Sequence, residues 1–518
     1  MTPGEKRFLV VLLSFIFQIV FVMSLGALFS ELGTAITIIY TILSILLVLE
    51  IIKNTKSLSS NLPWIVLILL FPAAGTMLYL FIGNDFHSSK MLKKVNKEVA
   101  NSKRYYKKDE EIIKELDENN LDKLKYLAIS ANFSVTKNNK VKYFSTGEET
   151  FKQMEIELNK AEKYIFMEYF RIDTGRFWST ILGILEKKVK EGVEVRLIYD
   201  DFGCIAPMPN DFAEQLEKKG IKTVAFNEVK TFRGIIMNNR DHRKFTIIDG
   251  KVAFCGGINI ADEYINEKKR FGYWKDNGIM IKGEGVHNFI VMFLSLWNAY
   301  KENEEDYLKY DVDHSIKYKD NGYLSCYCDN PLDSDYVGEN VYLNIINQSK
   351  KYLYISTPYL IPDSELQKAL ILASKRGVDV KIIVPKIADK KIVYSLTSSY
   401  FESLIKNGIE IYTFTPGFIH SKVFIADDNV CTVGTFNLDY RSLYLHFECG
   451  IYMENVDEIK NVKKDLVKTI SESHKVTEKE ATPSIIKGIW QSLLRLFAPL
   501  MWNKNMENLY SFLLIKFT

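Results

Sequence analysis

His242-Arg-Lys-Phe-Thr-Ile-Ile-Asp249 is repeated 178 residues later as His420-Ser-Lys-Val-Phe-Ile-Ala-Asp427. Each stretch holds a histidine, a lysine and an aspartate at the same spacing around an apolar run. Because side chains alternate along a strand, the histidine and lysine of each stretch point to the same face. One His-x-Lys pair is weak evidence of a site, whereas the repeated pattern predicts two related half-sites.

The similarity between the two halves extends to the segments before these motifs. Lys163–Tyr169 parallels Lys351–Ser356, and Gly192–Ile198 parallels Gly377–Ile383. Short runs rich in Val, Ile and Tyr alternate with charged helical stretches from about residue 110 onward, which is typical of α/β structure. We therefore predict an α/β fold that contains two copies of one unit.

Further polar residues follow both motifs in a similar register. Asn259 and Asn437 each lie 17 residues after their histidine, and the carboxylates Asp276 and Glu448 lie 34 and 28 residues after theirs. Two His, two Lys and two Asn around one centre would stabilise the charge of a reacting phosphate. A neutral histidine is a competent nucleophile at phosphorus, and a second histidine can protonate the leaving alkoxide.

These residues form three candidate groups. The candidate catalytic residues are His242, Lys244, Asp249, His420, Lys422 and Asp427. We expect the two motif aspartates to brace their own loops, Asn259 and Asn437 to bind substrate, and Asp276 and Glu448 to orient the imidazoles. No metal or other cofactor is expected. The remaining histidines are interpreted as surface or core residues: His87, His287, His314, His446 and His474.

The N-terminal part carries three apolar runs, at residues 8–29, 35–52 and 62–82. They predict a membrane anchor over residues 1–84 with two or three transmembrane helices. A cleaved signal peptide is the alternative for the first run, but it would have a shorter apolar core and a small-residue cleavage site. Pro72 and Gly75 allow a kink or a re-entrant path in the third run, so the number of spans stays open.

A dense basic stretch follows the third apolar run. By the positive-inside rule it belongs in the cytoplasm, where it would also be attracted to anionic lipid headgroups. Lys53 and Lys56 place positive charge before the third run as well, so the orientation of that run is not decided by charge. The basic residues are Lys90, Lys93, Lys94, Lys97, Lys103, Arg104, Lys107 and Lys108.

The C-terminal part begins with apolar pairs that recur every four residues from Ile485. Basic and polar residues lie between them, which predicts an amphipathic helix. It either packs on the catalytic core or lies in the lipid interface. Six cysteines in 518 residues indicate neither a disulfide framework nor a metal site.

The chain resembles the phospholipase D superfamily and, within it, the bacterial cardiolipin synthases. The first half of the resemblance is carried by Asn239–Gly250, Gly256–Tyr264 and Tyr273–Asp276, and the second half by Gly417–Lys422 and Gly434–Ser442. Trp64–Gly83 is similar to the membrane segment that precedes the catalytic part of this family. The similarity extends over residues 35–502, and it excludes the first apolar run and the tail.

This resemblance implies two similar α/β/α lobes that share one active site. The implied reaction joins two phosphatidylglycerol molecules into cardiolipin and releases glycerol, through a phosphatidyl-histidine intermediate. In relatives the nucleophile is usually the first-motif histidine, here His242, with His420 as acid and then base. The symmetry of the motifs leaves this assignment reversible. The expected segments are an anchor at 1–84, a basic linker at 85–125, lobes at 126–310 and 311–480, and an amphipathic segment at 481–518.

Three other functions were weighed. A membrane-bound phospholipase D that hydrolyses phospholipids to phosphatidic acid would use the same motifs and the same intermediate. A nucleic-acid phosphodiesterase is disfavoured by the predicted anchor and by a net charge of only +3. A catalytically dead lipid-binding scaffold is disfavoured because both motif sets are complete. We expect phosphatidylglycerol and other anionic lipids as partners, and the cell membrane as the location, with a multi-pass anchor and a cytoplasmic catalytic domain.

Overall fold

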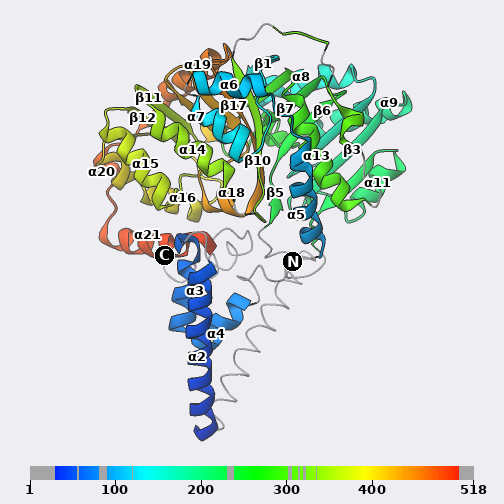
Figure 1. Cartoon of the computed structure of the whole chain (residues 1–518). Helices are drawn as coiled ribbons and strands as arrows, with labels where there is room; N and C mark the ends of the chain where they lie inside the picture. Colours follow the sequence, from blue (N-terminus) through cyan, green and yellow to red (C-terminus); the bar gives the residue numbers. More distant parts are fainter. Residues whose placement is uncertain are drawn as a thin grey trace. The chain divides into compact units, whose positions relative to one another are not determined.

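The computed structural model describes residues 30–54, 58–80, 90–119, 121–229, 239–301, 306–312, 315–318, 322–333 and 335–500 (Figure 1). The first apolar run and the tail from 503 lie outside these residues. The chain divides into two compact units. One comprises Met1–Ser88, Glu228–Asn238 and Ser492–Thr518, and the other comprises Ser89–Asn227 and Asn239–Gln491.

The first half of the large unit is built on a seven-stranded mixed sheet. Its inner strands are buried along their whole length, as expected for strands covered on both faces. Strands β2, β3 and β4 are parallel to one another, and the others are antiparallel. The order is β1 (Asn139–Phe144), β9 (Gly278–Gly283), β7 (Val252–Gly256), β6 (Lys244–Ile248), β2 (Tyr164–Tyr169), β3 (Glu194–Asp200) and β4 (Lys222–Phe226).

The second half repeats this topology strand for strand. Each strand of the first sheet has a counterpart at the same place in the second, so the predicted duplication is present in the backbone. β18 (Ser473–Lys475) extends the second sheet at its β13 edge. The order of the others is β10 (Tyr323–Asp329), β17 (His446–Glu454), β16 (Val430–Gly434), β15 (Val423–Ala426), β11 (Tyr352–Ser356), β12 (Asp379–Pro385) and β13 (Glu410–Phe414).

Helices cover these sheets and give the α/β lobes that the sequence predicted (Figure 1). The helix α13 is apolar and buried from Val286 to Ala299, and it packs against strands of both sheets. The main helices of the first lobe are α8 (Gly147–Asn159), α9 (Arg176–Lys190), α11 (Phe212–Lys218) and α13 (Val286–Tyr300). Those of the second are α14 (Val337–Gln348), α15 (Ser364–Lys375), α16 (Lys391–Ser399), α17 (Phe401–Ile405) and α19 (Ile459–Ser471).

Two short strands cross from one lobe to the other. β5 (Arg240–Asp241), just before the first motif, pairs in parallel with the start of β17 in the second lobe. β14 (Gly417–Ile419), just before the second motif, pairs in parallel with β8 (Tyr273–Lys275) in the first lobe. Each motif histidine therefore directly follows a short strand that pairs with the opposite lobe.

The basic stretch after residue 89 belongs to the large unit, where its first part forms α5 (Lys90–Ser102). The acidic helix α6 (Glu110–Glu118) follows it. Leu92 and Val95 are buried, and α5 packs along α13. Four lysines of α5 lie on its exposed face. They are Lys90, Lys93, Lys94 and Lys97.

The smaller unit contains α2 (Ser30–Asn54), α3 (Leu58–Leu70) and α4 (Pro72–Leu78). The third apolar run is broken between α3 and α4, at the proline that the sequence singled out. The Ser44 hydroxyl of α2 lies 2.8 Å from that of Thr76 in α4. A Cβ on Gly75 would lie 2.3 Å from the Leu67 carbonyl oxygen, so only glycine allows this close approach.

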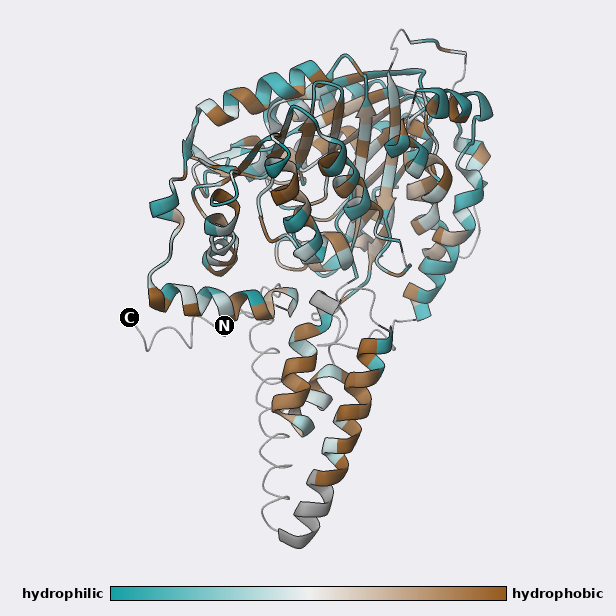
Figure 2. Cartoon of the chain, turned by 60° about the vertical axis from the view of Figure 1, so that its left-hand side comes forward, coloured by the Kyte–Doolittle hydropathy of each residue, from teal (hydrophilic) through white to brown (hydrophobic). Residues whose placement is uncertain are grey.

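Apolar residues dominate α2 and α3, which are mostly brown in Figure 2, and many of their side chains are exposed. Leu46 and Leu49 are each 57% exposed. Within the described residues, no helix combines the length and the hydropathy that crossing a bilayer requires. The expected transmembrane helices are thus not confirmed by this structure.

The expected amphipathic helix is present as α21 (Ile485–Phe497). The Gln491 side chain donates to the Ser395 carbonyl at 3.2 Å and lies 3.1 Å from the Ser398 hydroxyl of α16. Ile485 and Ile486 are more than four-fifths exposed. One side of the helix is therefore docked on the large unit, while its first apolar residues are uncovered.

Candidate active site

The two motif histidines each pair with a carboxylate of the other lobe. His242 Nδ1 lies 2.8 Å from Glu448 Oε1, and His420 Nδ1 lies 2.7 Å from Asp276 Oδ2. The crossing strands produce this exchange, because the His242 amide donates to the Phe447 carbonyl and the His420 amide to the Lys275 carbonyl. Both carboxylates are completely buried. With Nδ1 occupied, each ring is left with Nε2 for chemistry.

The two carboxylates have different surroundings. Glu448 also accepts hydrogen bonds from the hydroxyls of Ser442 and Thr435. The position equivalent to Thr435 in the first lobe is Gly257, where a Cβ would lie 2.2 Å from Asp276 Oδ1. Asp276 instead accepts from the backbone amide of Asn277 at 2.9 Å. The two half-sites thus have the same backbone arrangement but differ in the hydrogen bonds that hold each carboxylate.

The motif lysines are buried beside their own histidines. Lys244 Nζ donates to the His242 carbonyl at 2.5 Å, and Lys422 Nζ lies 2.9 Å from His420 Nδ1. Burial lowers the pKa of Lys244 to about 8 and that of Lys422 to about 7, because the charged forms are poorly solvated. An incoming phosphate anion would favour the ammonium forms, so the lysines are suited to binding it.

Both motif histidines favour the neutral form. Burial and the nearby ammonium of Lys422 lower the pKa of His420 to about 4, although Asp276 opposes the shift. Burial, followed by Lys244 and neighbouring groups of both lobes, brings the pKa of His242 well below its usual value. Charges of both half-sites act on one another here, which indicates one shared centre. A neutral imidazole is the nucleophilic form.

The pKa values of the two carboxylates are shifted in opposite directions. Burial raises the pKa of Glu448 well above its usual value, and the attraction of Lys244 and the two hydroxyl bonds only partly offset this. Burial also acts to raise the pKa of Asp276, but the charge and hydrogen bond of His420 outweigh it and the pKa is lowered. Asp276 therefore favours the ionised form, whereas Glu448 is the more basic of the two carboxylates.

The motif aspartates lie at the far ends of the motif strands. Asp249 accepts three backbone hydrogen bonds from residues 162–164, each 2.8 Å long. Asp427 accepts the equivalent three from residues 350–352. Both have positive φ, 53° and 55°, as a tight turn requires. These carboxylates brace the loops between helix and strand, as expected, and do not face the histidines.

The two asparagines are less alike than their spacing suggested. Asn259 is engaged within the first lobe, because its oxygen accepts from the Arg171 amide and its nitrogen donates to the Tyr264 hydroxyl at 2.7 Å. Asn437 is also buried, but its side-chain oxygen has no hydrogen-bond partner among the described residues. Asn437 is thus better placed than Asn259 to accept a new partner.

Among the described residues, five rings lie close to the motif histidines. Phe170 lies 5.0 Å from His242 between ring centroids, and Phe418 lies 5.9 Å from His420. His446 lies 5.6 Å from His242, and Trp274 and Tyr264 lie 5.3 and 5.5 Å from His420. His446 and Trp274 each come two residues before an orienting carboxylate, so strand alternation places them on the same face.

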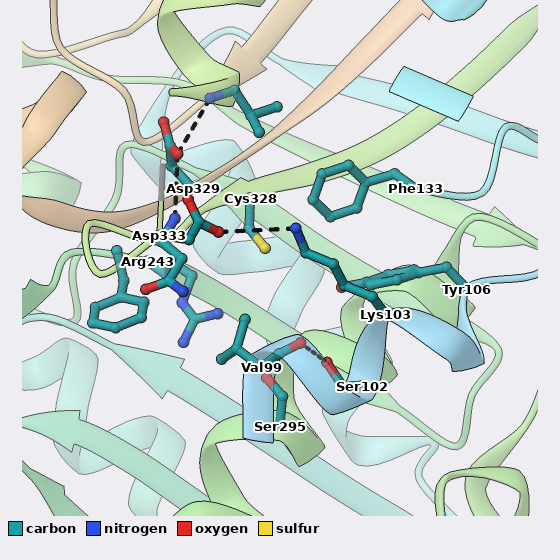
Figure 3. Close-up of a pocket in the computed structure, with 13 residues that line it drawn as sticks. Val99, Ser102, Lys103, Tyr106, Phe133, Arg243, Ser295, Cys328, Asp329 and Asp333 are labelled. Atoms are coloured by element: carbon teal, nitrogen blue, oxygen red, sulfur yellow. Dashed lines mark hydrogen bonds and ion pairs between the residues drawn. The ribbon is translucent and has the colours of Figure 1, made fainter. Parts of the chain in front are cut away.

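The residue between histidine and lysine has a structural role in the first motif. Arg243 points away from the histidine and forms a buried ion pair with Glu168 at 2.7 Å. The second lobe has a hydrogen bond between Ser421 and Ser356 at this place. A small cavity of about 20 Å³ lies beside Arg243. Cys328 and Val99 of α5 also line it, as Figure 3 shows. It has room for about one water molecule, so it is not a substrate site.

Two side-chain clusters among the described residues have ligand types and spacing that fit a metal ion. One is His242, His446 and Glu448, and the other is Glu339, Asp363 and Glu365. The acidic cluster is already engaged, because the Tyr444 hydroxyl donates to Glu339 and lies 2.8 Å from Asp363. Outside the active site, His287 is a core residue and His474 pairs with Glu480 near the surface. His87 and His314 lie outside the described residues.

Comparison with known proteins places both lobes in one family. The family model described as cardiolipin synthase, phospholipase D-like domain, matches residues 154–297 and 342–470. A second model, described as the N-terminal region of phospholipase D nucleases, matches residues 42–84. Together the two segments of the first model cover more than half of the chain.

Individual relatives agree with these family matches. An uncharacterised protein of Streptococcus mutans is 45% identical over 88% of this chain and 99% of its own length. A cardiolipin synthase of Clostridium perfringens is 35% identical over 85% of this chain and 93% of its own length. Cardiolipin synthase 1 of Staphylococcus aureus is 31% identical over 91% of this chain and 99% of its own length. The crystal structure of a phosphatidylserine synthase from Haemophilus influenzae shares the fold, with a TM-score of 0.54 and 15% identity over 71% of this chain and 94% of its own.

Proposed function

This chain belongs to the cardiolipin synthase family of phospholipase D-like proteins, and we propose that it transfers a phosphatidyl group from one phosphatidylglycerol to another. The products are cardiolipin and glycerol, and the enzyme is a phosphatidyltransferase. The observation that supports this most directly is the crossed pairing of two buried histidines with two buried carboxylates. That pairing supplies a nucleophile and an acid–base group at one phosphate.

In the first half-reaction, Nε2 of His242 attacks the phosphorus of the first phosphatidylglycerol. A P–N bond forms and the bond from phosphorus to the glycerol oxygen breaks. His420 gives that oxygen its proton. The substrate anion offsets the positive charge of Lys422 that lowers the His420 pKa, so binding favours the protonated ring, which Asp276 then stabilises. Lys244 and Lys422 stabilise the negative charge on the remaining phosphate oxygens.

In the second half-reaction, a glycerol hydroxyl of another phosphatidylglycerol attacks the phosphatidyl-histidine. His420 is now neutral and takes the hydroxyl proton as the new P–O bond forms. The P–N bond breaks and returns its electron pair to His242. Neither half-reaction changes an oxidation state, and the proton that left with glycerol is replaced by that of the second lipid.

Hydrolysis to phosphatidic acid is the competing outcome, because water can attack the same intermediate. A lipid acceptor is favoured if the enzyme is held at a bilayer, where phosphatidylglycerol is concentrated and can add binding energy through its chains. Phe170 and Phe418, together with Trp274 and Tyr264, surround the histidines with apolar surface that limits water. This is why we favour transfer.

We also propose that the enzyme is embedded in the cell membrane through residues 1–84, with the lobes at 126–310 and 311–480 in the cytoplasm. The half-exposed leucines and isoleucines of α2 support this, because so much uncovered apolar surface is unusual in contact with water. The lysines on α5 and the uncovered face of α21, within the 481–518 segment, would contact anionic lipid.

The test is product analysis of the full-length protein in vesicles of phosphatidylglycerol labelled in its terminal glycerol. We expect cardiolipin and free labelled glycerol as the main products. A His242→Ala/His420→Ala double variant controls for contaminating lipases. Phosphatidic acid as the dominant lipid product would identify a hydrolase instead.

A further inference from the structure

The third histidine of the active site, His446, has no role in the reaction described above. It begins β17 two residues before Glu448, and its ring centroid lies 5.6 Å from that of His242. Its Nε2 atom is shielded from solvent and has no hydrogen-bond partner among the described residues. A shielded ring nitrogen without a partner is costly unless a ligand engages it.

One nitrogen of each histidine and one Glu448 oxygen lie within 4.8 Å of one another. We propose that His242, His446 and Glu448 bind a divalent transition-metal ion, Zn²⁺ above all, and that the bound ion blocks the enzyme. Two imidazoles and one carboxylate leave the fourth tetrahedral position open, a ligand set that zinc accepts readily. Mg²⁺ and Ca²⁺ prefer oxygen ligands and should not compete.

Positively charged side chains of both lobes act on His446 and oppose the ion. They are Arg441, Lys244, Arg240 and Lys390. Zinc should therefore bind reversibly, so that a chelator can remove it.

Inhibition follows from which atoms the ion would occupy. It would bind a lone pair of the proposed nucleophile His242, and it would draw Glu448 away from orienting that ring. The other half-site offers a contrast, because Trp274 stands beside His420 at the place of His446. His420 and Asp276 alone provide only two ligands, so we expect one zinc ion per chain.

The experiment uses the full-length protein in phosphatidylglycerol vesicles, freed of metal by a chelator. Zinc bound per chain is measured by equilibrium dialysis against protein-free vesicles, and lipid turnover is measured at the same free zinc concentrations. Because binding is measured without turnover, its result does not depend on which lipid product the enzyme makes. We expect one ion per chain, loss of turnover as that ion binds, and recovery on adding chelator.

The decisive variant is His446→Asn, which removes one of three ligands and leaves the proposed nucleophile and acid–base group in place. Relative to its own metal-free turnover, it should need at least about tenfold more zinc for half-inhibition. The surface substitution His474→Asn is the matched control and should behave as the unaltered protein. Equal zinc sensitivity of His446→Asn and the control would overturn the proposal, as would the absence of bound zinc at about 0.1 mM.

Discussion

Glu448→Gln tests whether the carboxylate of the other lobe supports the nucleophile. The amide keeps the shape of the side chain. Thr435 and Ser442 donate to different oxygens of Glu448, so the hydroxyl that faces the amide nitrogen can accept from it while the other still donates to the amide oxygen. The amide oxygen can then still accept from His242 Nδ1, so the tautomer is retained. What is lost is a charge-assisted hydrogen bond to a ring that becomes positive, worth about 2 kcal/mol more than a neutral one. That corresponds to roughly a thirtyfold lower rate.

The assay compares cardiolipin formation by Glu448→Gln with that by Glu454→Gln in phosphatidylglycerol vesicles. Glu454 is a buried carboxylate on the same strand, and its ion pair with Lys123, 3.3 Å long, lies outside the active site. The control should lose thermal stability but retain its turnover per folded molecule. Full activity of Glu448→Gln would show that the crossed pair is not used. A loss as large as that of His242→Ala would show that Glu448 does more than orient.

Four further outcomes follow from the structure. His242→Ala and His420→Ala should each reduce turnover by about 10⁴-fold or more, and the double variant should be no worse, because the two act as a unit; additive losses would contradict this. Asp249→Ala should lower the free energy of unfolding by about 3 kcal/mol through three lost backbone bonds, measured by denaturant titration, with turnover per folded molecule retained. Vanadate, a phosphate analogue, should bind at least about tenfold more weakly at pH 9 than at pH 6. The reason is that Lys422 and Lys244 are ammonium ions only below pKa values of about 7 and 8. Reversing the four exposed α5 lysines should weaken association with anionic vesicles by about 1 kcal/mol each, and salt should reduce the difference.

The sequence predicted the duplicated α/β fold because the apolar runs that form buried strands are repeated, as well as the His-x-Lys motifs. Each Val/Ile/Tyr-rich run that matched between the halves became an equivalent strand, as β2 and β11 illustrate. The bracing role of Asp249 and Asp427 was also foreseeable, because both end an apolar strand at a turn. The spacing of Asp276 and Glu448 identified them as partners of the histidines.

The exchange of partners between lobes could not be foreseen from spacing. It depends on β5 and β14, which are only two and three residues long and carry no periodic signal. His446 was missed because a lone histidine in an apolar strand is usually a core residue. Its position two residues before Glu448, matching Trp274 before Asp276, was the available signal. The asparagines match in sequence but differ in their contacts. The Asn259 side chain donates to the Tyr264 hydroxyl, whereas the equivalent position in the second lobe is Ser442, whose hydroxyl accepts from the backbone amide of Asn437.

The proposed mechanism is tested most directly by locating the phosphatidyl group on the protein. Because His420 acts in both half-reactions, the intermediate is sought in the unaltered protein during turnover. The protein would be mixed with phosphatidylglycerol labelled in its phosphate, quenched rapidly at alkaline pH to preserve a P–N bond, and digested for mass spectrometry. We predict label on the peptide that contains His242 and none on the equivalent peptide of His242→Ala. Label on another residue, or cardiolipin formation with no labelled protein, would contradict the two-step transfer through His242.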